Sequence, residues 1–348
     1  MTIDHASAAN AVLALRAVLA AAPSTLAPNV LLCQLIDQGL DRLPLPGGGA
    51  TRARWQALAA VAEHDLSLAK LYEGHTDALA ILAELGLPDD AKRGAGWGVW
   101  AAEGPDGRVV IEPQPGNTVL LRGTKHWCSG ASHLSHGLLT AWPADGRGPQ
   151  LVAVAMHQPS VVIDPSPWQA VGMAGSASVD VSFSGALAHS VGAVGAYLTR
   201  PGFWHGGAGV AACWHGAATA IGATLRRKLA ATARAGRSAF QLAALGRIDL
   251  QLESTRALLR EAAQWIDEHP QADASAVALR VRLAAETAAT RVLDEAGRAL
   301  GATPFCRDAR FARMAADLPV FVRQSHAERD FAALGERLLE PCPSPWTL

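Results

Sequence analysis

The stretch Gly123-Thr124-Lys125-His126-Trp127-Cys128-Ser129-Gly130-Ala131 is the part of the sequence that best predicts the fold. Its pattern predicts a strand that ends in a turn of small residues. Trp127 and Ser129 lie two residues apart, so a regular strand would place both side chains on one face. An aromatic plane beside a hydroxyl is suited to packing and hydrogen bonding with a bound ring. The alternative is that Trp127 is a core tryptophan of a β domain, because tryptophan is usually well buried.

Short runs of β-forming residues surround this stretch, from about Gly94 to Leu198. The run Val179-Asp180-Val181-Ser182-Phe183 alternates with a period of two, as a half-buried strand does. No helical pattern separates the runs, so residues 94–200 are predicted to form a middle antiparallel β domain rather than βαβ units. The other predicted strands are Val109–Ile111, Thr118–Leu120, Leu151–Ala155 and Val161–Ile163.

Helical patterns lie on both sides of this region. Residues 1–93 are predicted to form an N-terminal helical domain, with helices over 29–38, 51–63 and 65–85. Residues 201–348 show four helical segments, of which the third runs from Ser275 to Leu300 and ends at Gly301. The fourth is expected over residues 318–339, with Asp317 as N-cap and Pro319 in the first turn. The predicted fold class is therefore α+β: an N-terminal helical domain, a middle antiparallel β domain and a C-terminal four-helix bundle.

Composition excludes several classes of protein. The chain has 348 residues, of which 50% are apolar and 18% charged, which excludes intrinsic disorder as the main state. The formal net charge is −1, which argues against nucleic-acid binding by phosphate neutralisation. The five cysteines are scattered and never form a C-x-x-C pair, so we expect a reducing compartment and no structural zinc or other metal site.

Residues 206–225 carry no formal charge and are long enough to span a bilayer. They are mostly glycine and alanine, with Trp214 and His215 near the centre, so transfer into lipid is unfavourable. We therefore expect a buried helix, and a soluble, cytoplasmic protein without a membrane partner.

Four local motifs, in this order along the chain, resemble the acyl-CoA dehydrogenase superfamily of flavoproteins. The first is Val99-Trp100-Ala101-Ala102-Glu103, and the second is the opening stretch, residues 123–131. The third is Gly172-Met173-Ala174-Gly175-Ser176, with Ala174 where the family has arginine. The fourth is Leu300-Gly301 followed by Arg307-Asp308-Ala309. The order of helices, strands and helices agrees with this resemblance.

The resemblance implies an FAD cofactor and assigns residues to it. Trp127 and Ser129 would lie beside the isoalloxazine ring, and the backbone of Ala101 and Ala102 would approach its pyrimidine edge. Arg237 would reach the pyrophosphate of the FAD, because arginine offers a fork of donors to phosphate. The alternative for Arg237 is a solvated residue in a helix connection. Gly301, at the turn after the third C-terminal helix, completes the implied cofactor residues.

The usual catalytic glutamate of the family is absent at its expected place. Asp317 falls within a residue of that position and is the first candidate for the base that removes an α-proton. The alternative for Asp317 is a plain helix N-cap. His205 and His326 are substitute candidates, because histidine can act as a base near neutral pH, although most histidines carry no chemistry.

The first functional hypothesis is an FAD-dependent oxidoreductase that carries out α,β-dehydrogenation of an acyl thioester, bound to CoA or to a carrier protein. The alternative within the same superfamily is a flavin-dependent monooxygenase, in which reduced flavin meets oxygen beside His326. A third hypothesis is a non-catalytic member that kept the fold. The resemblance also implies a homodimer or homotetramer and an electron-transfer partner.

Overall fold

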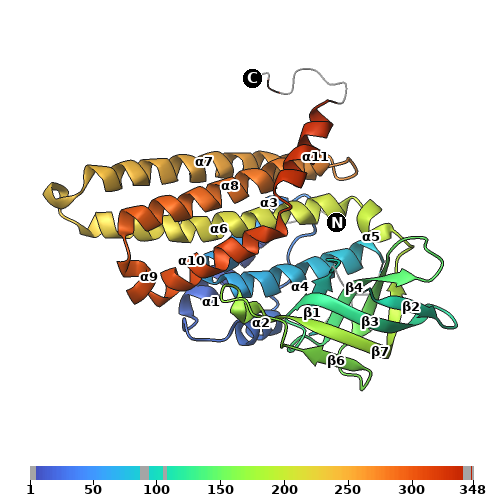
Figure 1. Cartoon of the computed structure of the whole chain (residues 1–348). Coiled ribbons are helices and arrows are strands. Elements are labelled where there is room, and N and C mark those ends of the chain that lie inside the picture. Colours follow the sequence, from blue (N-terminus) through green and yellow to red (C-terminus); the bar gives the residue numbers. More distant parts are fainter. Residues whose placement is uncertain (1–4, 87–93, 105–107, 340–345, 347–348) are drawn as a thin grey trace. The chain divides into compact units, whose positions relative to one another are not determined.

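The computed structural model describes residues 5–86, 94–104, 108–339 and 346. The chain forms two compact units. The first, here the helical unit, comprises Met1–Val12, Pro44–Leu66 and Trp204–Leu348. The second, here the barrel unit, comprises Leu13–Leu43 and Ser67–Phe203. Helix α1 (His5–Ala21) contributes residues to both, and the elements are labelled in Figure 1.

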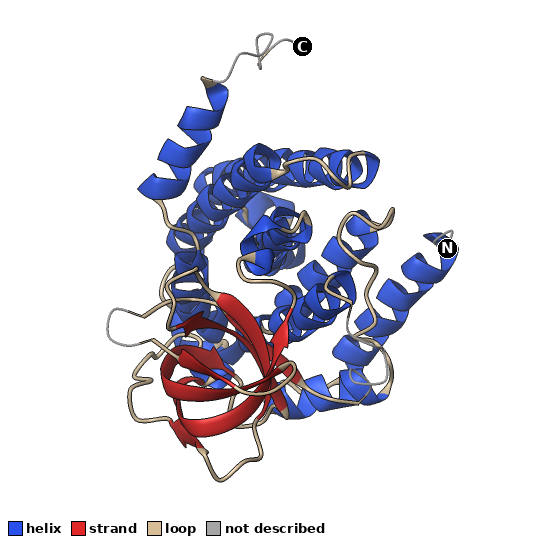
Figure 2. Ribbon diagram, turned by 90° about the vertical axis from the view of Figure 1, so that its right-hand side faces the viewer, coloured by secondary structure: helices blue, strands red, loops and turns tan. Residues whose placement is uncertain are grey.

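The barrel unit is built around strands that curl into a closed ring (Figure 2). Strand β4 pairs with β2, β2 with β3, β3 with β7, β7 with β5, and β5 again with β4. Beside this ring, β1 pairs with β4, and β6 with β7. The strands are β1 (Trp97–Trp100), β2 (Val110–Pro113), β3 (Thr118–Ser129), β4 (His136–Pro143), β5 (Gln150–Ala155), β6 (Val161–Asp164) and β7 (Ser178–Val191), and the helices are α2 (Pro28–Asp37), α4 (Leu66–Glu84) and α5 (Ala196–Thr199).

The predicted antiparallel β domain is wrong. Strands β1 and β2 both run parallel to β4, and the remaining pairs are antiparallel. A parallel pair needs a crossover connection, which is usually a helix. Here β3 and the loop after it make the crossover between β2 and β4, so the absence of helical patterns did not exclude parallel pairing. Closure of the ring also leaves its five strands without a free edge.

Helix α4 covers part of the barrel with an apolar face. Ile81 and Leu82 pack against Trp97 of β1, Leu138 of β4 and Leu151 of β5, and all five are buried. Burial of one such side chain contributes about 1.5–3 kcal/mol. This cluster fixes β1 and β4, and therefore also the loops that follow them.

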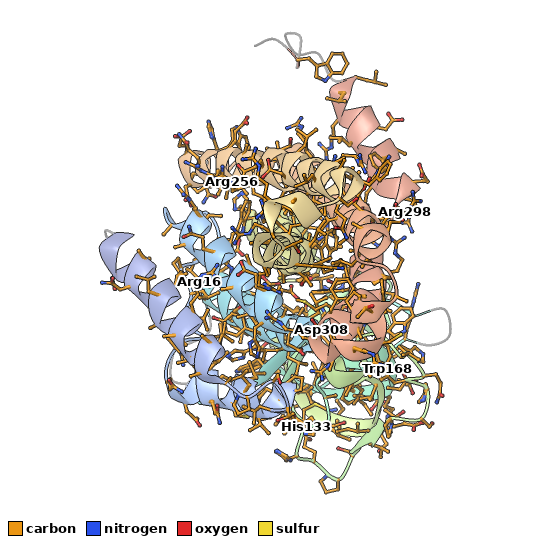
Figure 3. All side chains as sticks on the ribbon, turned by 90° about the vertical axis from the view of Figure 1, so that its left-hand side faces the viewer. Arg16, His133, Trp168, Arg256, Arg298 and Asp308 are labelled. Atoms are coloured by element: carbon orange, nitrogen blue, oxygen red, sulfur yellow. The ribbon has the colours of Figure 1, made fainter. Side chains whose placement is uncertain are left out.

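The helical unit contains α3 (Thr51–His64), α6 (Gly202–Ala231), α7 (Ala239–Glu268), α8 (Ser275–Leu300), α9 (Thr303–Arg307), α10 (Ala309–Phe321) and α11 (Glu328–Leu338). The predicted helix over residues 275–300, ending at Gly301, is confirmed. Figure 3 shows Arg256 of α7 and Arg298 of α8, two exposed residues of this unit.

The predicted C-terminal four-helix bundle is wrong. The fourth predicted helix, over residues 318–339, is divided into α10, a short 3-10 turn (Val322–Gln324) and α11. The N-cap of helix α10 is Asp308, nine residues before Asp317, and its carboxylate accepts hydrogen bonds from the backbone N–H groups of Arg310 and Phe311. Pro319 therefore lies inside the helix rather than in its first turn. Helix α3, from the N-terminal region, also belongs to this unit.

The predicted buried helix over residues 206–225 lies within α6. Among the residues that the structure describes, no helix has the length and apolar character needed to cross a membrane.

Candidate functional site

A β-bulge in β3 places Trp127 in an unusual backbone conformation. Lys125 pairs with Val181 of β7 and Cys128 with Val179, so His126 and Trp127 together oppose the single residue Asp180. His126 Nδ1 lies 2.7 Å from an Asp180 carboxylate oxygen, which ties the extra residue to the neighbouring strand.

Trp127 has a φ of +57°, in the left-handed region. For a residue with a Cβ this conformation costs about 1–2 kcal/mol. The side chain is 50% exposed, so apolar burial does not offset that cost fully. A large aromatic ring that is held at the surface in a strained conformation is a candidate contact for a ligand.

The loop after β1 lies against the same part of β3. The indole N–H of Trp100 donates to the carbonyl oxygen of Ser129 at 3.1 Å. Lys125 Nζ donates to Glu103 at 2.9 Å. A Cβ on Gly104 would fall 2.4 Å from the His126 ring, so a larger residue there would displace that ring. The structure therefore brings Ala101 and Ala102, which lie between these contacts, to the strand that carries Trp127 and Ser129.

Burial lowers the pKa of Lys125, and the hydrogen bond to Glu103 opposes that shift. The ammonium group also donates to the hydroxyl and the carbonyl oxygen of Thr140, at 2.9 and 3.1 Å. Beside it, burial raises the pKa of the Cys128 thiol, and this thiol donates to the Lys125 carbonyl oxygen. Both groups are structural supports of the bulge.

Ser129 differs from Trp127 in burial, because the bulge interrupts the alternation of a regular strand. Its side chain is 9% exposed, and its Oγ lies 2.7 Å from Ser178 Oγ of β7. Ser178 Oγ lies 3.0 Å from Ser176 Oγ, in the short turn Ala174–Ser176. Met173 and Ala177, on either side of this turn, both have positive φ.

Trp127 offers an exposed aromatic plane, which is of the kind that packs against a flat ring such as that of a flavin. Sequence reasoning missed Ser176, Ser178 and the His126–Asp180 contact. The motif Gly172–Ser176 was recognised, but nothing in it indicated contact with a residue about fifty positions away.

The three predicted acid–base residues belong to the helical unit and have different surroundings. Asp317 is buried inside α10. His205 is buried near the start of α6, and a Cβ on Gly47 would lie 3.0 Å from its Nδ1. His326 is exposed before α11, with Nδ1 3.3 Å from Asp330.

The two remaining predicted cofactor residues also lie in the helical unit. Arg237 Nε donates to the carbonyl oxygen of Thr232 at 3.0 Å, in the connection between α6 and α7. Cationic side chains often satisfy carbonyl groups near helix C-termini in this way. Gly301 has a φ of +70° and follows the last residue of α8, where it ends the helix.

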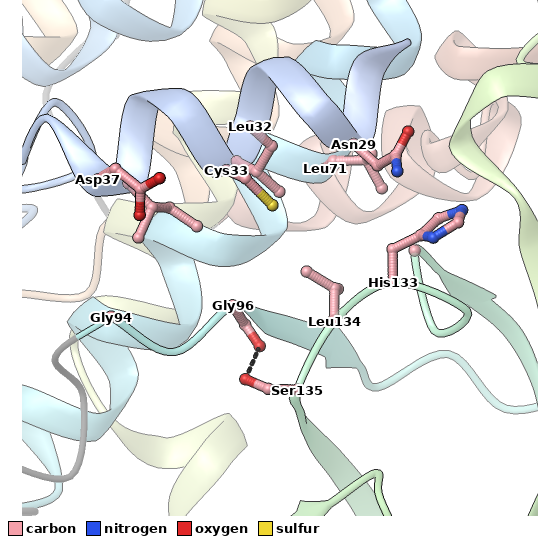
Figure 4. Close-up of a pocket in the computed structure, with 12 residues that line it drawn as sticks. Asn29, Leu32, Cys33, Asp37, Leu71, Gly94, Gly96, His133, Leu134 and Ser135 are labelled. Atoms are coloured by element: carbon pink, nitrogen blue, oxygen red, sulfur yellow. Dashed lines mark hydrogen bonds between the residues drawn. The ribbon is translucent and has the colours of Figure 1, made fainter.

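A separate pocket of the barrel unit, of about 180 Å³, lies beside α2 (Figure 4). Asn29, Cys33 and Asp37 recur every four residues along one face of α2, opposite His133. The Ser135 hydroxyl donates to the Gly96 carbonyl oxygen at 3.1 Å on its other side. Sites for ligands of drug size have volumes of about 300–1,000 Å³, so this pocket is too small for a flavin nucleotide.

Solved structures with the same fold are flavin-dependent enzymes. The dibenzothiophene monooxygenase TdsC from Paenibacillus sp. A11-2, in complex with FMN and indole, superposes with a TM-score of 0.81 at 19% identity, over 98% of this chain and 99% of that chain. This chain therefore has the same fold as TdsC. KijD3, in complex with FMN and a dTDP-linked amino sugar, has a TM-score of 0.81 at 18% identity, over 99% and 96% of the two chains. The methanesulfinate monooxygenase MsuC from Pseudomonas fluorescens has a TM-score of 0.78 at 19% identity, over 99% of both.

No protein-family model matches the sequence, and no curated protein sequence matches it significantly. Two of these neighbours are solved with FMN, which agrees with the resemblance to flavoproteins that the sequence motifs show. Identities this low show the fold alone.

Proposed function

We propose that this chain is a flavin-dependent monooxygenase that binds reduced FMN and oxygenates a small sulfur- or nitrogen-containing organic substrate. The observation that carries the proposal is the full-length match to TdsC, a monooxygenase solved with FMN. The site around Trp127 and Ser129 supports it, because strain and exposure are concentrated where a flavin ring fits. The sulfur and nitrogen class follows from the neighbours named as dibenzothiophene monooxygenase, methanesulfinate monooxygenase and nitrososynthase.

FMN replaces FAD in this proposal, because the complexes of TdsC and KijD3 contain FMN. FMN has a single phosphate, so the pyrophosphate contact expected of Arg237 is not required. The Trp127 ring would pack on the isoalloxazine, Ser129 would hydrogen-bond its edge, and the backbone of Ala101 and Ala102 would hold its pyrimidine side.

When bound, reduced flavin supplies two electrons and two hydrogens to O₂, so that one oxygen atom enters the substrate and the other leaves as water. This chain's residues would hold the ring, exclude bulk water and relay one of the two hydrogens, as a proton, to the oxygen that leaves as water. His205, Asp317 and His326 are the candidates for passing on that proton, because each side chain can take up and release one. A separate reductase would provide the reduced flavin, and assembly as a homodimer or homotetramer remains a prediction.

The test is direct. Purified protein is mixed with reduced FMN and ¹⁸O₂, together with dibenzothiophene, indole or methanesulfinate, and products are analysed by mass spectrometry. We expect one ¹⁸O atom in a product, and loss of both FMN binding and product in Trp127→Ala. Leu187→Ala is the control, since Leu187 of β7 is also 50% exposed in the barrel unit.

Bleaching of bound oxidised flavin by acyl-CoA under anaerobic conditions would contradict the proposal and support α,β-dehydrogenation. Absence of binding to FMN in both redox states would support the non-catalytic alternative. A pH profile that is unchanged in His205→Gln would remove His205 from its proposed role.

A further inference from the structure

The pocket of the barrel unit beside α2 plays no part in the proposed function. Its lining includes neither Trp127 nor Ser129 (Figure 4). Its volume of about 180 Å³ is that of about six water molecules, at about 30 Å³ each in the liquid. A ligand that fills it therefore has about the size of one aromatic ring with a short side chain.

Buried leucine side chains line one part of this pocket. They are Leu32 of α2, Leu71 of α4 and Leu134 between β3 and β4. Gly130 lies against two of them, because a Cβ there would fall 2.8 Å from Leu71 Cδ2 and 2.9 Å from Leu134 Cδ1. This packing holds the leucines in place, so the pocket presents a fixed apolar surface to the hydrocarbon part of a ligand.

Four polar side chains line the same pocket. Asn29, Cys33 and Asp37 lie on one face of α2, and His133 lies opposite them (Figure 4). In the described part of the chain, none of these side chains makes a hydrogen bond or an ion pair with another protein group. A few polar groups that converge on an apolar pocket without protein partners are typical of a binding site for a small molecule.

Asp37 gives this pocket a negative charge. An anion such as phosphate would be repelled, because no lysine or arginine of the described residues lines the pocket to offset the carboxylate. Asp37 is also the last residue of α2, whose last turn holds no basic residue. A carboxylate is unfavourable there, because the unpaired carbonyl groups of a helix C-terminus carry partial negative charge. An ammonium group would relieve this repulsion, since both the carboxylate and the helix end attract a cation.

The described residues contain no group of three His, Cys, Asp or Glu side chains placed to hold a metal ion, so an organic cation fits the pocket better. We infer that the pocket binds a small primary amine, whose ammonium group pairs with Asp37 and whose apolar body packs on Leu32 and Leu134. Cys33 lies one helical turn before Asp37, about 6 Å along the axis at about 1.5 Å per residue, so it lies beside that apolar body. This ligand site is independent of the proposed flavin site.

Protection of Cys33 from alkylation tests the inference. Cys33 is exposed and lines the pocket, so a bound ligand should slow its reaction with iodoacetamide. Cys306 of the helical unit is also exposed, and its rate corrects for any reagent that an amine consumes. The probe is benzylamine, compared at one pH with the neutral benzyl alcohol and the anionic benzoate, and both rates are followed by mass spectrometry of peptides. We expect benzylamine to slow the reaction of Cys33 several-fold relative to Cys306, and the other two compounds to bind at least about 5-fold more weakly.

Two variants test the part of Asp37. Asp37→Asn keeps the shape of the side chain and removes its charge, so the dissociation constant of benzylamine should rise about 5-fold. The variant should fold at least as well as the wild type, because it removes a carboxylate from a helix C-terminus. Gln34→Ala is the matched control, since Gln34 is an exposed residue of α2 outside the pocket, and it should leave the dissociation constant unchanged.

Three results would overturn the inference. They are the absence of protection of Cys33 by benzylamine, equal protection by benzyl alcohol, and an unchanged dissociation constant in Asp37→Asn. The last two would show an apolar pocket without preference for a cation. None of these measurements involves FMN, so each result leaves the proposed function standing, and a failure to bind FMN would leave the amine site standing.

Discussion

The barrel unit and the helical unit differ in how much of their backbone departs from regular geometry. Three of the four non-glycine residues with positive φ in the described part of the chain, Trp127, Met173 and Ala177, belong to the barrel unit, around one set of serine hydroxyls. The fourth, Ala327, lies in the helical unit. Close approach through glycine occurs in both units, and in the barrel unit a Cβ on Gly123 of β3 would lie 2.3 Å from the carbonyl oxygen of Arg108. A Cβ on Gly216 of α6 would lie 2.3 Å from the carbonyl oxygen of Ala59 in α3.

This difference separates two kinds of constraint. In the helical unit, the contact between α6 and α3 depends on the missing side chain of Gly216, and both helices stay regular there. In the barrel unit, irregular backbone is concentrated at one place and held by specific polar contacts, as is typical of functional sites. Substitutions should therefore affect stability and ligand binding differently in the two units.

The largest expected effect is in the helical unit. Gly216→Ala should destabilise the protein by about 4 kcal/mol or more, because the new methyl group meets backbone that cannot move without separating two helices. Gly207→Ala, in the same helix but with no atom within 4 Å of the position that its methyl group would take, is the control and should stabilise by up to about 1 kcal/mol. Urea unfolding measures both. An equal change in the free energy of unfolding in both variants would refute close packing at Gly216.

The second effect is in the barrel unit, at a buried polar network. The backbone N–H of Trp97 donates to His75 Nδ1, and His75 Nε2 then donates to the buried carboxylate of Asp41 at 3.0 Å. His75→Ala should cost about 3 kcal/mol, because it leaves a buried charge without this donor. The exposed His189→Ala is the control for urea unfolding. A loss below about 1 kcal/mol would show that Asp41 finds another donor.

The third prediction compares the effects of two Trp127 substitutions on stability and on FMN binding. Trp127→Gly should be more stable than Trp127→Ala by about 1 kcal/mol, since glycine adopts a φ of +57° without strain. Both variants should lose FMN binding, because both remove the ring. Thermal unfolding and FMN titration measure the two properties. Equal stability of the variants would show that the bulge carries no strain.

The smallest expected effect is a pH dependence of stability that arises from His215 in the helical unit. Burial lowers the pKa of His215, so its folded pKa lies below its usual value of 6.5. The unfolded chain then binds a proton first as the pH falls, and stability decreases below about pH 6.5. His215→Gln should reduce the loss of urea midpoint between about pH 7.5 and about pH 5.5. The same loss of urea midpoint in the wild type and in the variant would show that His215 does not cause the pH dependence.

Local signals in the sequence predicted much of the helical structure. The helix from Ser275 to Leu300 ends where a glycine can adopt positive φ, and the helices over 51–63 and 65–85 match α3 and α4 closely. The fourth C-terminal helix was mispredicted, because Asp308 and Asp317 both precede apolar residues and only Asp308 caps a helix. When two residues carry equally strong capping signals, only the packing of the folded chain decides which of them caps the helix.

The sequence by itself predicted most of the helices and several of the strands, because periodicity and turn chemistry act over a few residues. The resemblance of residues 123–131 to a flavoprotein motif drew attention to Trp127 and Ser129. Only the tertiary structure decided that the strands close into a ring, that β1 and β2 run parallel to β4, and that Trp127 sits on a bulge opposite Asp180. The contact between Ser129 and Ser178 spans 49 residues, and strand pairing alone brings its two hydroxyls together. The hydrogen bond between these two hydroxyls therefore depends on the closed barrel.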